Sequence, residues 1–371
     1  MKRTLFWVGV AGFLAYATDT AYALPRFAAE MGLKCQSCHI NPSGGGMRKM
    51  FGAKFGREEL PVPTWSKDAD VSDFTNLLNN LLGVGADFST LYFARQIPNA
   101  SGSGSTTYNS FWEMQGDIYL NFRVAKNVDL YFSKGLYSGF EAFGLLSILP
   151  EKGYIKVGKF VPNYGTKLDD HTAFIRTYAG FSPETGRPEL TGLEGGIAPG
   201  PASITLGLYN ATDGFGGSGG SEKALLARAE GMFSLGEQSH FGIGANVFQK
   251  KTPTGTAQTL YGAFGSINIG NLVVLGEGDL LRRTEADTIA TGVILYAEAD
   301  YEVTQGFSLI LAYDFYDPNK DLKTGALARY SFGFGFYPLS GVEVRPIYRI
   351  VKDEPVDLNN NEFDLVFHIY L

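Results

Sequence analysis

The chain has 371 residues and is rich in glycine, with 47 of them, and in aromatic side chains, at 14%, whereas charged residues make up only 19%. Its formal net charge of −7 argues against nucleic acid and anionic lipid surfaces as partners. Only two cysteines are present, so any site that needs two thiols must use this pair.

Residues 1–23 have the pattern of a secretory signal peptide. Lys2-Arg3 precedes an apolar run from Leu5 to Tyr16, and Ala21-Tyr22-Ala23 offers a small-x-small cleavage site, so we expect the mature chain to start at Leu24. The run is too short for a stable membrane helix, and no later segment approaches the roughly 20 apolar residues that a spanning helix needs. The sequence therefore predicts an exported protein without a helical anchor.

Residues 24–65 contain the run Cys35-Gln36-Ser37-Cys38-His39. A C-x-x-C-H run is the attachment site of a c-type haem. Two thiols one helical turn apart can add to the two haem vinyl groups while the adjacent histidine reaches the iron. We therefore predict one covalent haem c on Cys35 and Cys38, with His39 as the proximal iron ligand, and a redox function.

Two other uses of the cysteine pair are open to the sequence. A structural zinc needs four ligands, but beyond this motif the chain offers only His171, His240 and His368, which are not clustered. A redox-active disulfide between cysteines three apart normally sits in a βαβ context, which is missing here. Haem attachment is favoured over both.

After a linker at residues 66–80, residues 81–371 read as short alternating strands separated by turns. Sixteen strands are predicted, at 81–95, 112–124, 127–138, 140–149, 153–160, 189–198, 202–210, 225–235, 239–249, 257–269, 271–282, 289–302, 306–316, 325–337, 340–351 and 362–371. An even number of strands is typical of a bacterial outer-membrane barrel.

Two of these strands show the expected two-residue period clearly. In residues 112–124 one face carries Trp112, Met114, Gly116, Ile118, Leu120, Phe122 and Val124, and the other carries Glu113, Gln115, Asp117, Tyr119, Asn121 and Arg123. In residues 362–371 one face carries Phe363, Leu365, Phe367, Ile369 and Leu371, and the other carries Asp364, Val366, His368 and Tyr370. One face suits lipid and the other suits a water-filled interior.

The connections also alternate. Tight turns at Asn127, 149–153, 236–238 and 270–271 contrast with long polar loops, which span residues 98–110, 162–188, 211–222 and 317–323. Such an alternation matches the periplasmic and extracellular rims of an outer-membrane barrel. A soluble β-sandwich or soluble barrel is the alternative, but it would put polar residues on the face that is apolar here. We predict an all-β transmembrane barrel of about 16 strands in the outer membrane of a Gram-negative bacterium.

The segment at residues 24–65 is too small to bury much apolar surface by itself, so it needs the haem and a wall to dock against. A barrel of about 16 strands encloses a space large enough for a channel or a plug. We expect this cytochrome-like segment to plug the lumen.

Three stretches of the chain carry a family resemblance. Pro25-Arg26-Phe27-Ala28, the run Cys35 to His39, and Met50-Phe51-Gly52-Ala53-Lys54-Phe55-Gly56 resemble the N-terminal region of the fused monohaem cytochrome-porins of iron-oxidising bacteria. The resemblance implies one c-type haem joined to a porin of about 16 strands. It also implies electron transfer across the outer membrane, from extracellular ferrous iron to periplasmic carriers. The stretch Asn41 to Gly46 departs from the iron oxidases and is compatible with a sister group that carries electrons outward.

The sixth haem ligand has several candidates. Met47 and Met50 lie within short reach of the motif in a glycine-rich segment, and ligation by histidine and methionine raises the reduction potential. Met31, His171 in a long loop, and His368 on the predicted lumen face are the other candidates. We predict Met47 or Met50.

Three classes of function follow. The first is an electron conduit, with a periplasmic c-type cytochrome or other carrier, an extracellular metal ion or mineral, and outer-membrane lipid as partners, and with Fe(II) oxidase activity as its enzymatic form. The second is a passive porin whose haem is structural or regulatory. The third is a haem enzyme such as a peroxidase, which needs distal acid-base groups that no sequence pattern supplies.

Overall fold

The computed structural model describes residues 25–66, 77–79, 81–99, 105–136, 139–149, 152–183, 188–211, 222–236, 238–251, 255–285, 288–357 and 360–371. The predicted signal peptide and most of the predicted linker lie outside these ranges. Within them, no helix combines the length and the apolar character needed to cross a bilayer.

The described residues form a few short helices and all sixteen predicted strands, but the second strand begins at Ser105, inside the stretch 98–110 for which the sequence predicts a loop. The helices are α2 (Pro25–Met31), the 3₁₀ turn η1 (Cys35–Ser37), α3 (Met50–Glu58), α4 (Pro63–Ser66) and α5 (Phe174–Thr177). The strands are β1 (Leu82–Pro98), β2 (Ser105–Ala125), β3 (Val128–Gly135), β4 (Phe140–Leu149), β5 (Gly153–Phe160), β6 (Leu190–Ile197), β7 (Ala202–Asn210), β8 (Lys223–Gly236), β9 (Ser239–Lys251), β10 (Ala257–Ile269), β11 (Leu272–Glu285), β12 (Thr288–Thr304), β13 (Phe307–Asp317), β14 (Leu327–Leu339), β15 (Val342–Asp353) and β16 (Glu362–Tyr370).

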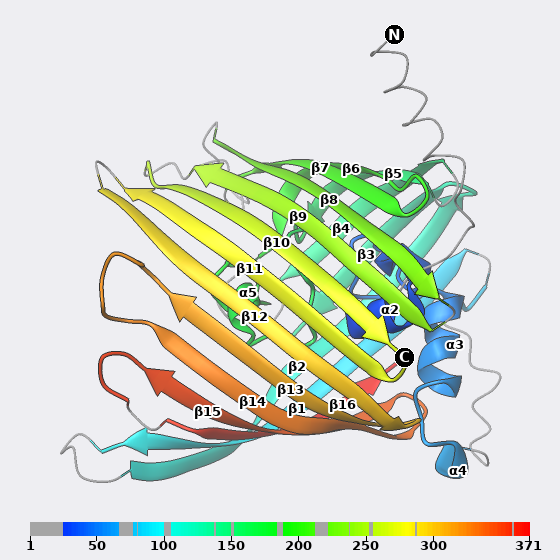
Figure 1. The fold of residues 1–371 in the computed structure, drawn as a ribbon. Coiled ribbons are helices and arrows are strands. Elements are labelled where there is room, and N and C mark those ends of the chain that lie inside the picture. Colours follow the sequence, from blue (N-terminus) through cyan, green and yellow to red (C-terminus); the bar gives the residue numbers. More distant parts are fainter. Residues whose placement is uncertain are drawn as a thin grey trace.

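The sixteen strands form one closed antiparallel barrel (Figure 1). Each strand pairs with its neighbours in sequence, and β1 closes the ring against β16, where Phe88 lies opposite Ile369 and Ser89 opposite His368. Closure leaves no sheet edge unpaired, as a bilayer requires. The barrel predicted from the two-residue periodicity is therefore confirmed.

Alternate side chains point to the two sides of the wall. On β7, Leu206 and Leu208 are 62% and 47% exposed, whereas Thr205 and Tyr209, which flank them in the sequence, are buried in the interior. Apolar residues repeat on the outside of most strands, and a soluble barrel would present polar side chains there. The outer surface is therefore the lipid-facing surface.

The predicted faces of β2 hold for its second half but not throughout. Ile118 and Val124 are exposed on the outside and Tyr119 and Asn121 are buried inside, as expected. A register shift between β1 and β2 at Ser89 and Thr90 then disrupts the alternation. Because a β-bulge places one extra residue in one strand, Met114 lines an inner cavity together with Gln115 instead of facing lipid.

The long connection between β5 and β6 folds into the barrel over its described residues 161–183 and carries α5 (Figure 1). Its amides bond to polar side chains on the inner wall, where the amide of Gly165 donates to Asn246 Oδ1 (2.6 Å) and that of Phe174 to Asp314 Oδ1 (2.8 Å). Buried amides need such acceptors, so the inner polar face of the strands fixes this loop in place.

The N-terminal segment docks at the opposite rim, where the strands are joined by short turns. Lys34 Nζ donates to the carbonyl of Gly200 (2.7 Å), and Ser340 Oγ donates to the carbonyl of Arg57 (2.7 Å). Figure 1 shows α3 and α4 at this rim, close to the C-terminal end of β16. That this segment plugs the lumen stays a prediction.

Candidate functional site

The C-x-x-C-H run forms one tight turn. The amide of Cys38 donates to the carbonyl of Cys35 (3.2 Å), and the amide of His39 donates to the same carbonyl (2.9 Å). Both cysteines are free, with Cys35 partly exposed and Cys38 buried. The turn therefore presents two thiols and an imidazole from adjacent positions, which is the arrangement that haem attachment needs.

The surroundings of the thiols favour neutral sulfur. Burial raises the pKa of the Cys38 thiol to about 12, with Cys35 adding to the effect, and burial also raises the pKa of Cys35 above its ordinary value. Zinc binding and thiol exchange both use the thiolate. A thioether to haem is uncharged and loses nothing by such burial. Within the described ranges, no three His, Cys, Asp or Glu side chains form a metal-binding group, so the zinc alternative gains no support.

The imidazole of His39 is buried and oriented. Its Nδ1 lies 3.2 Å from the carbonyl oxygen of Gly46, so Nδ1–H is the donor and Nε2 keeps its lone pair. Burial, followed by the charge of Arg48, lowers the pKa of His39 to about 4, and the ring is neutral at pH 7. An imidazole held by a carbonyl at one nitrogen and free at the other has the form of an iron ligand.

The glycine run after the motif lets the chain wrap closely around it. Gly44 and Gly46 have φ of +82° and +66°, which residues with a Cβ rarely adopt. A Cβ at Gly44 would lie 3.1 Å from Cys35 Sγ, and a Cβ at Gly46 would lie 2.1 Å from the hydroxyl oxygen of Tyr131. The departure from the iron-oxidase pattern thus forms a sharp turn against the thiols and the barrel wall.

Three cavities adjoin the motif. The cavity beside His39 has a volume of about 210 Å³, that beside Cys35 about 130 Å³, and a smaller one of about 40 Å³ contacts both Cys38 and His39. Apolar side chains contribute to the wall beside Cys35, and they include Leu33, Tyr154, Met232, Phe264 and Leu275. Two neutral sulfurs, a free imidazole nitrogen and a partly apolar space together fit a c-type haem.

The two methionines predicted as the sixth ligand lie elsewhere. Met47 is fully buried, its amide donates to the hydroxyl of Tyr131 (3.2 Å), and its Cγ lies 3.4 Å from where a Cβ at Gly85 would stand. Met50 is 56% exposed at the start of α3. Neither is among the residues that line the three cavities. Ligation by Met47 or Met50 stays a prediction, and in this arrangement it requires either side chain to move.

The other three histidines lie in different surroundings. His368 faces the lumen, as predicted, and lies between two carboxylates, with Nδ1 3.3 Å from Glu343 Oε2 and Nε2 3.4 Å from Asp87 Oδ1. His240, near the start of β9, lies against Gly32, and its ring occupies the space that a Cβ there would need. His171 lines the cavity beside His39.

Buried ion pairs hold the motif segment to the wall. Arg48 Nη1 lies 3.0 Å from Asp87 Oδ1, and Arg26 Nη2 lies 3.1 Å from Glu343 Oε1. The sequence alone does not reveal these ion pairs, because the partners of Arg48 and Arg26 are 39 and 317 residues away and only barrel closure brings them together. The sequence gives one general indication of such pairs, which is that arginines occur in a segment expected to dock inside a barrel with acidic side chains.

Comparison with solved structures supports the fold. The chain resembles OmpT of Vibrio cholerae with a TM-score of 0.59 and 11% identity over 80% of this chain and 99% of that one. It resembles an anion-selective porin of Comamonas acidovorans with a TM-score of 0.58 and 12% identity over 78% and 99% of the two chains. For OprB of Pseudomonas putida the values are 0.59 and 10%, over 80% and 95%.

Compared by sequence, the chain matches no protein-family model and no curated protein. The structural likeness concerns the barrel, and together with the apolar outer surface it places the chain in the outer membrane of a Gram-negative bacterium. The chain has the porin-like barrel fold of the outer membrane.

Proposed function

We propose that this chain transfers electrons across the outer membrane through one haem c, attached to Cys35 and Cys38 and ligated by His39, inside a porin-like barrel. The observation that carries the proposal is the tight C-x-x-C-H turn with a buried, neutral His39 that faces a cavity within the barrel. The haem, when bound, supplies a one-electron couple. The chain's own residues hold it, orient its iron ligand and keep it away from bulk solvent.

The position of the motif addresses the main geometric difficulty of a single-haem conduit. One haem cannot by itself bridge an apolar band about 25 Å tall. Here the motif segment contacts the short-turn rim at Gly200 and Ser340, which is the periplasmic rim of such barrels, and reaches inward as far as Lys156 on β5. A periplasmic carrier can approach from that rim, while an extracellular donor enters from the long-loop side.

The resemblance to fused cytochrome-porins supplies the partners. Extracellular Fe(II), as an ion or a mineral surface, is the proposed donor, and a periplasmic c-type cytochrome is the proposed acceptor. Fe(II) oxidase activity is then one half of the transfer. Flow in the opposite direction, from the periplasm outward, uses the same site.

Proteoliposomes test the proposal. Vesicles that contain the purified protein and enclose an oxidised soluble c-type cytochrome are given Fe(II) outside under anaerobic conditions, and the enclosed cytochrome is followed by its reduced-haem absorption bands. We expect reduction with the wild-type chain and none with Cys35→Ala/Cys38→Ala, which keeps the barrel but removes both attachment points. Equal rates for the two proteins would overturn the proposal. Reduced cytochrome inside and Fe(III) citrate outside test outward flow.

A passive porin is the second candidate, because the structural neighbours include an anion-selective porin. Its expected result is steady ion conductance in a planar bilayer that is the same with and without the two cysteines. The electron conduit instead predicts conductance far below that of an open 16-stranded porin, since the motif segment and the inward loop both contact the inner wall.

A further inference from the structure

The inward loop meets the motif segment inside the barrel. Lys167 Nζ donates to Ser43 Oγ and to the carbonyl of Gly44, both at 3.3 Å. Two residues further along, Asp169 lines the small cavity that also contacts Cys38 and His39. The loop from one rim and the motif segment from the other therefore lie in direct contact at the proposed haem centre.

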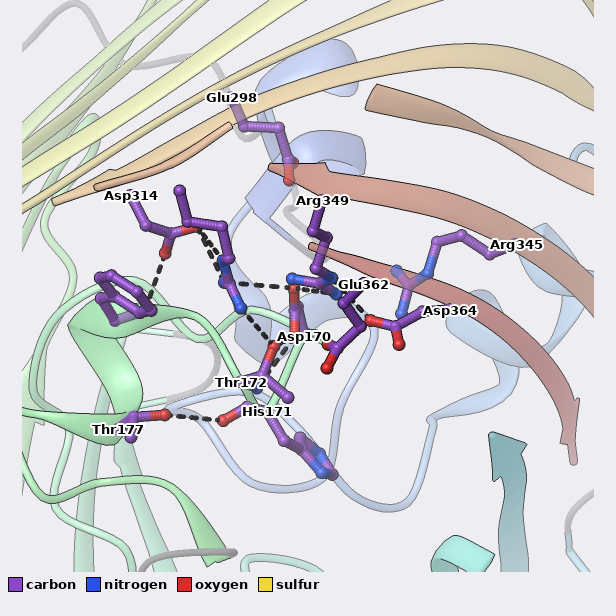
Figure 2. Close-up of polar contacts among 12 residues, drawn as sticks. Asp170, His171, Thr172, Thr177, Glu298, Asp314, Arg345, Arg349, Glu362 and Asp364 are labelled. Carbon is purple, nitrogen blue, oxygen red and sulfur yellow. Dashed lines mark hydrogen bonds and ion pairs between the residues drawn. The ribbon is translucent and has the colours of Figure 1, made fainter. Parts of the chain in front are cut away.

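His171 follows these contacts and lines the same cavity as His39. Its Nδ1 is buried, and it has no hydrogen-bond partner among the residues that the structure describes. A buried nitrogen without a partner destabilises the folded state, so this position favours the binding of a further group. Figure 2 shows the ring pointing away from the arginines that hold the neighbouring Asp170.

The residues on either side of His171 are rigidly held (Figure 2). Asp170 Oδ2 forms two ion pairs, one with Arg349 Nη2 at 3.0 Å and one with Arg329 Nη2 at 3.9 Å. Thr172 Oγ1 donates to Asp170 Oδ1 (2.7 Å) and accepts from Arg329 Nη1 (2.9 Å). A ligand on a loop fixed by its neighbours is positioned before the metal group arrives, which is how such sites gain affinity.

The backbone of His171 is held as well. Its carbonyl accepts hydrogen bonds from Ser182 Oγ (2.8 Å) and Thr177 Oγ1 (3.3 Å). The side chain is thus the part of this residue that the described loop leaves for another partner, and it is directed into the cavity.

Other side chains near the cavity are less suited to ligate iron. His368 also lines it, but both of its ring nitrogens lie within 3.4 Å of carboxylates, and a doubly donating imidazolium has no lone pair to give. Met47 belongs to the same buried apolar cluster as Tyr131 on the wall. Met114 also lines the cavity, and it is the thioether against which His171 is tested below.

We propose that His171 is the second axial ligand of the haem, opposite His39. This inference rests on the proposed function, because it needs the haem centre. Ligation by His171 would link the motif segment and the inward loop through the haem, and it would give bis-histidine ligation in place of ligation by Met47 or Met50. Ligation by methionine raises the reduction potential, so we expect the potential of this haem to lie below that of a His/Met cytochrome.

The test compares haem-loaded, detergent-purified variants by electron paramagnetic resonance, near-infrared magnetic circular dichroism and redox titration. We expect wild-type ferric haem to be low-spin without the charge-transfer band of thioether ligation. His171→Ala should become high-spin and return to low-spin when imidazole is added. His171→Met should show the thioether band and a raised reduction potential. This variant tests the same ligand position if His171→Ala does not fold.

Matched controls are His368→Gln, Met47→Leu and Met114→Leu, which should keep the wild-type spectra. A low-spin His171→Ala without added imidazole would overturn the inference, as would loss of low-spin character in either methionine variant. If the wild-type protein carries no covalent haem after alkaline pyridine treatment, the proposed function itself fails. If haem is present and His171 is not its ligand, only the present inference fails.

Discussion

Lys156 Nζ lies 2.8 Å from Glu194 Oε1, and neither side chain is exposed. Lys156 also donates to Asn41 Oδ1 (3.2 Å) and Ser43 Oγ (3.1 Å), so this buried pair on β5 and β6 reaches the turn that follows the haem motif. The barrel wall and the motif segment therefore share one charge network.

Lys156→Met is expected to lower the free energy of unfolding by about 3–5 kcal/mol, because it leaves the Glu194 charge buried without its cation. Denaturant unfolding followed by tryptophan fluorescence measures the loss. Lys320→Met is the control, since its partner Asp321 is 67% exposed and such surface pairs contribute less than about 1 kcal/mol. Equal, small effects for the two variants would contradict the role of the buried pair.

Gly46→Ala should reduce haem loading strongly, whereas Gly45→Ala should reduce it little. Both positions have positive φ, so each substitution carries the same strain of about 1–2 kcal/mol. Only at Gly46 would the new Cβ collide, at 2.1 Å from the Tyr131 hydroxyl, and displace the carbonyl that orients His39. Haem absorbance per protein measures loading, and similar values for the two variants would refute the explanation.

The reduction potential should fall as the pH rises from 7 to 9. Burial, and then the charge of Lys156, lowers the pKa of Lys167 to about 8, so its positive charge next to Gly44 is lost in this window. A nearby positive charge favours the reduced haem, and its loss favours the oxidised form. Glu141 and Glu194 act in the opposite direction and raise this pKa, whereas Arg176 lowers it further.

Lys167→Met should therefore lower the potential at pH 7 and flatten its dependence on pH between 7 and 9. Redox titrations at several pH values measure both effects, with Lys320→Met as the control for a distant lysine. A pH slope that survives in Lys167→Met would assign the titration to another group.

Asp170→Asn should loosen the inward loop. Burial alone would raise the pKa of Asp170, but Arg349 and Arg329 hold it below its ordinary range, so the carboxylate and its stabilising pairs persist at pH 5 and above and are lost on strong acidification. Removing the charge leaves two buried arginines without this partner. Faster amide hydrogen exchange across residues 161–183, unaffected by Asp321→Asn, is the expected result, and unchanged exchange would show that other contacts fix the loop.

The sequence revealed the barrel because its signal is local. The faces of β16 follow directly from the alternation of Phe367 and Ile369 with His368 and Tyr370, and the structure confirms them. Met114 was misplaced because a β-bulge at this residue shifts the alternation of β2, and the two-residue pattern alone does not show that shift.

The centre was only half accessible to sequence reasoning. Cys35, Cys38 and His39 are adjacent, so their spacing indicates their chemistry directly. The approach of His171 depends on Arg349 meeting Asp170 across 179 positions of the chain, and no local pattern encodes that encounter. Met47 was favoured for its closeness in sequence, yet its side chain is fully buried and lies toward the wall at Gly85 of β1.

The seam of the barrel is also part of the docking surface for the motif segment. The hydroxyl of Tyr370 on β16 donates to the carbonyl of Gly56 (3.1 Å), and Arg48 pairs with Asp87 on β1 while stacking over the Tyr370 ring at 4.7 Å. The C-terminal strand β16 thus forms part of the surface on which the motif segment docks. Because the same residues close the ring and hold the segment, we expect a variant that weakens the β1–β16 seam also to loosen the docking of the motif segment.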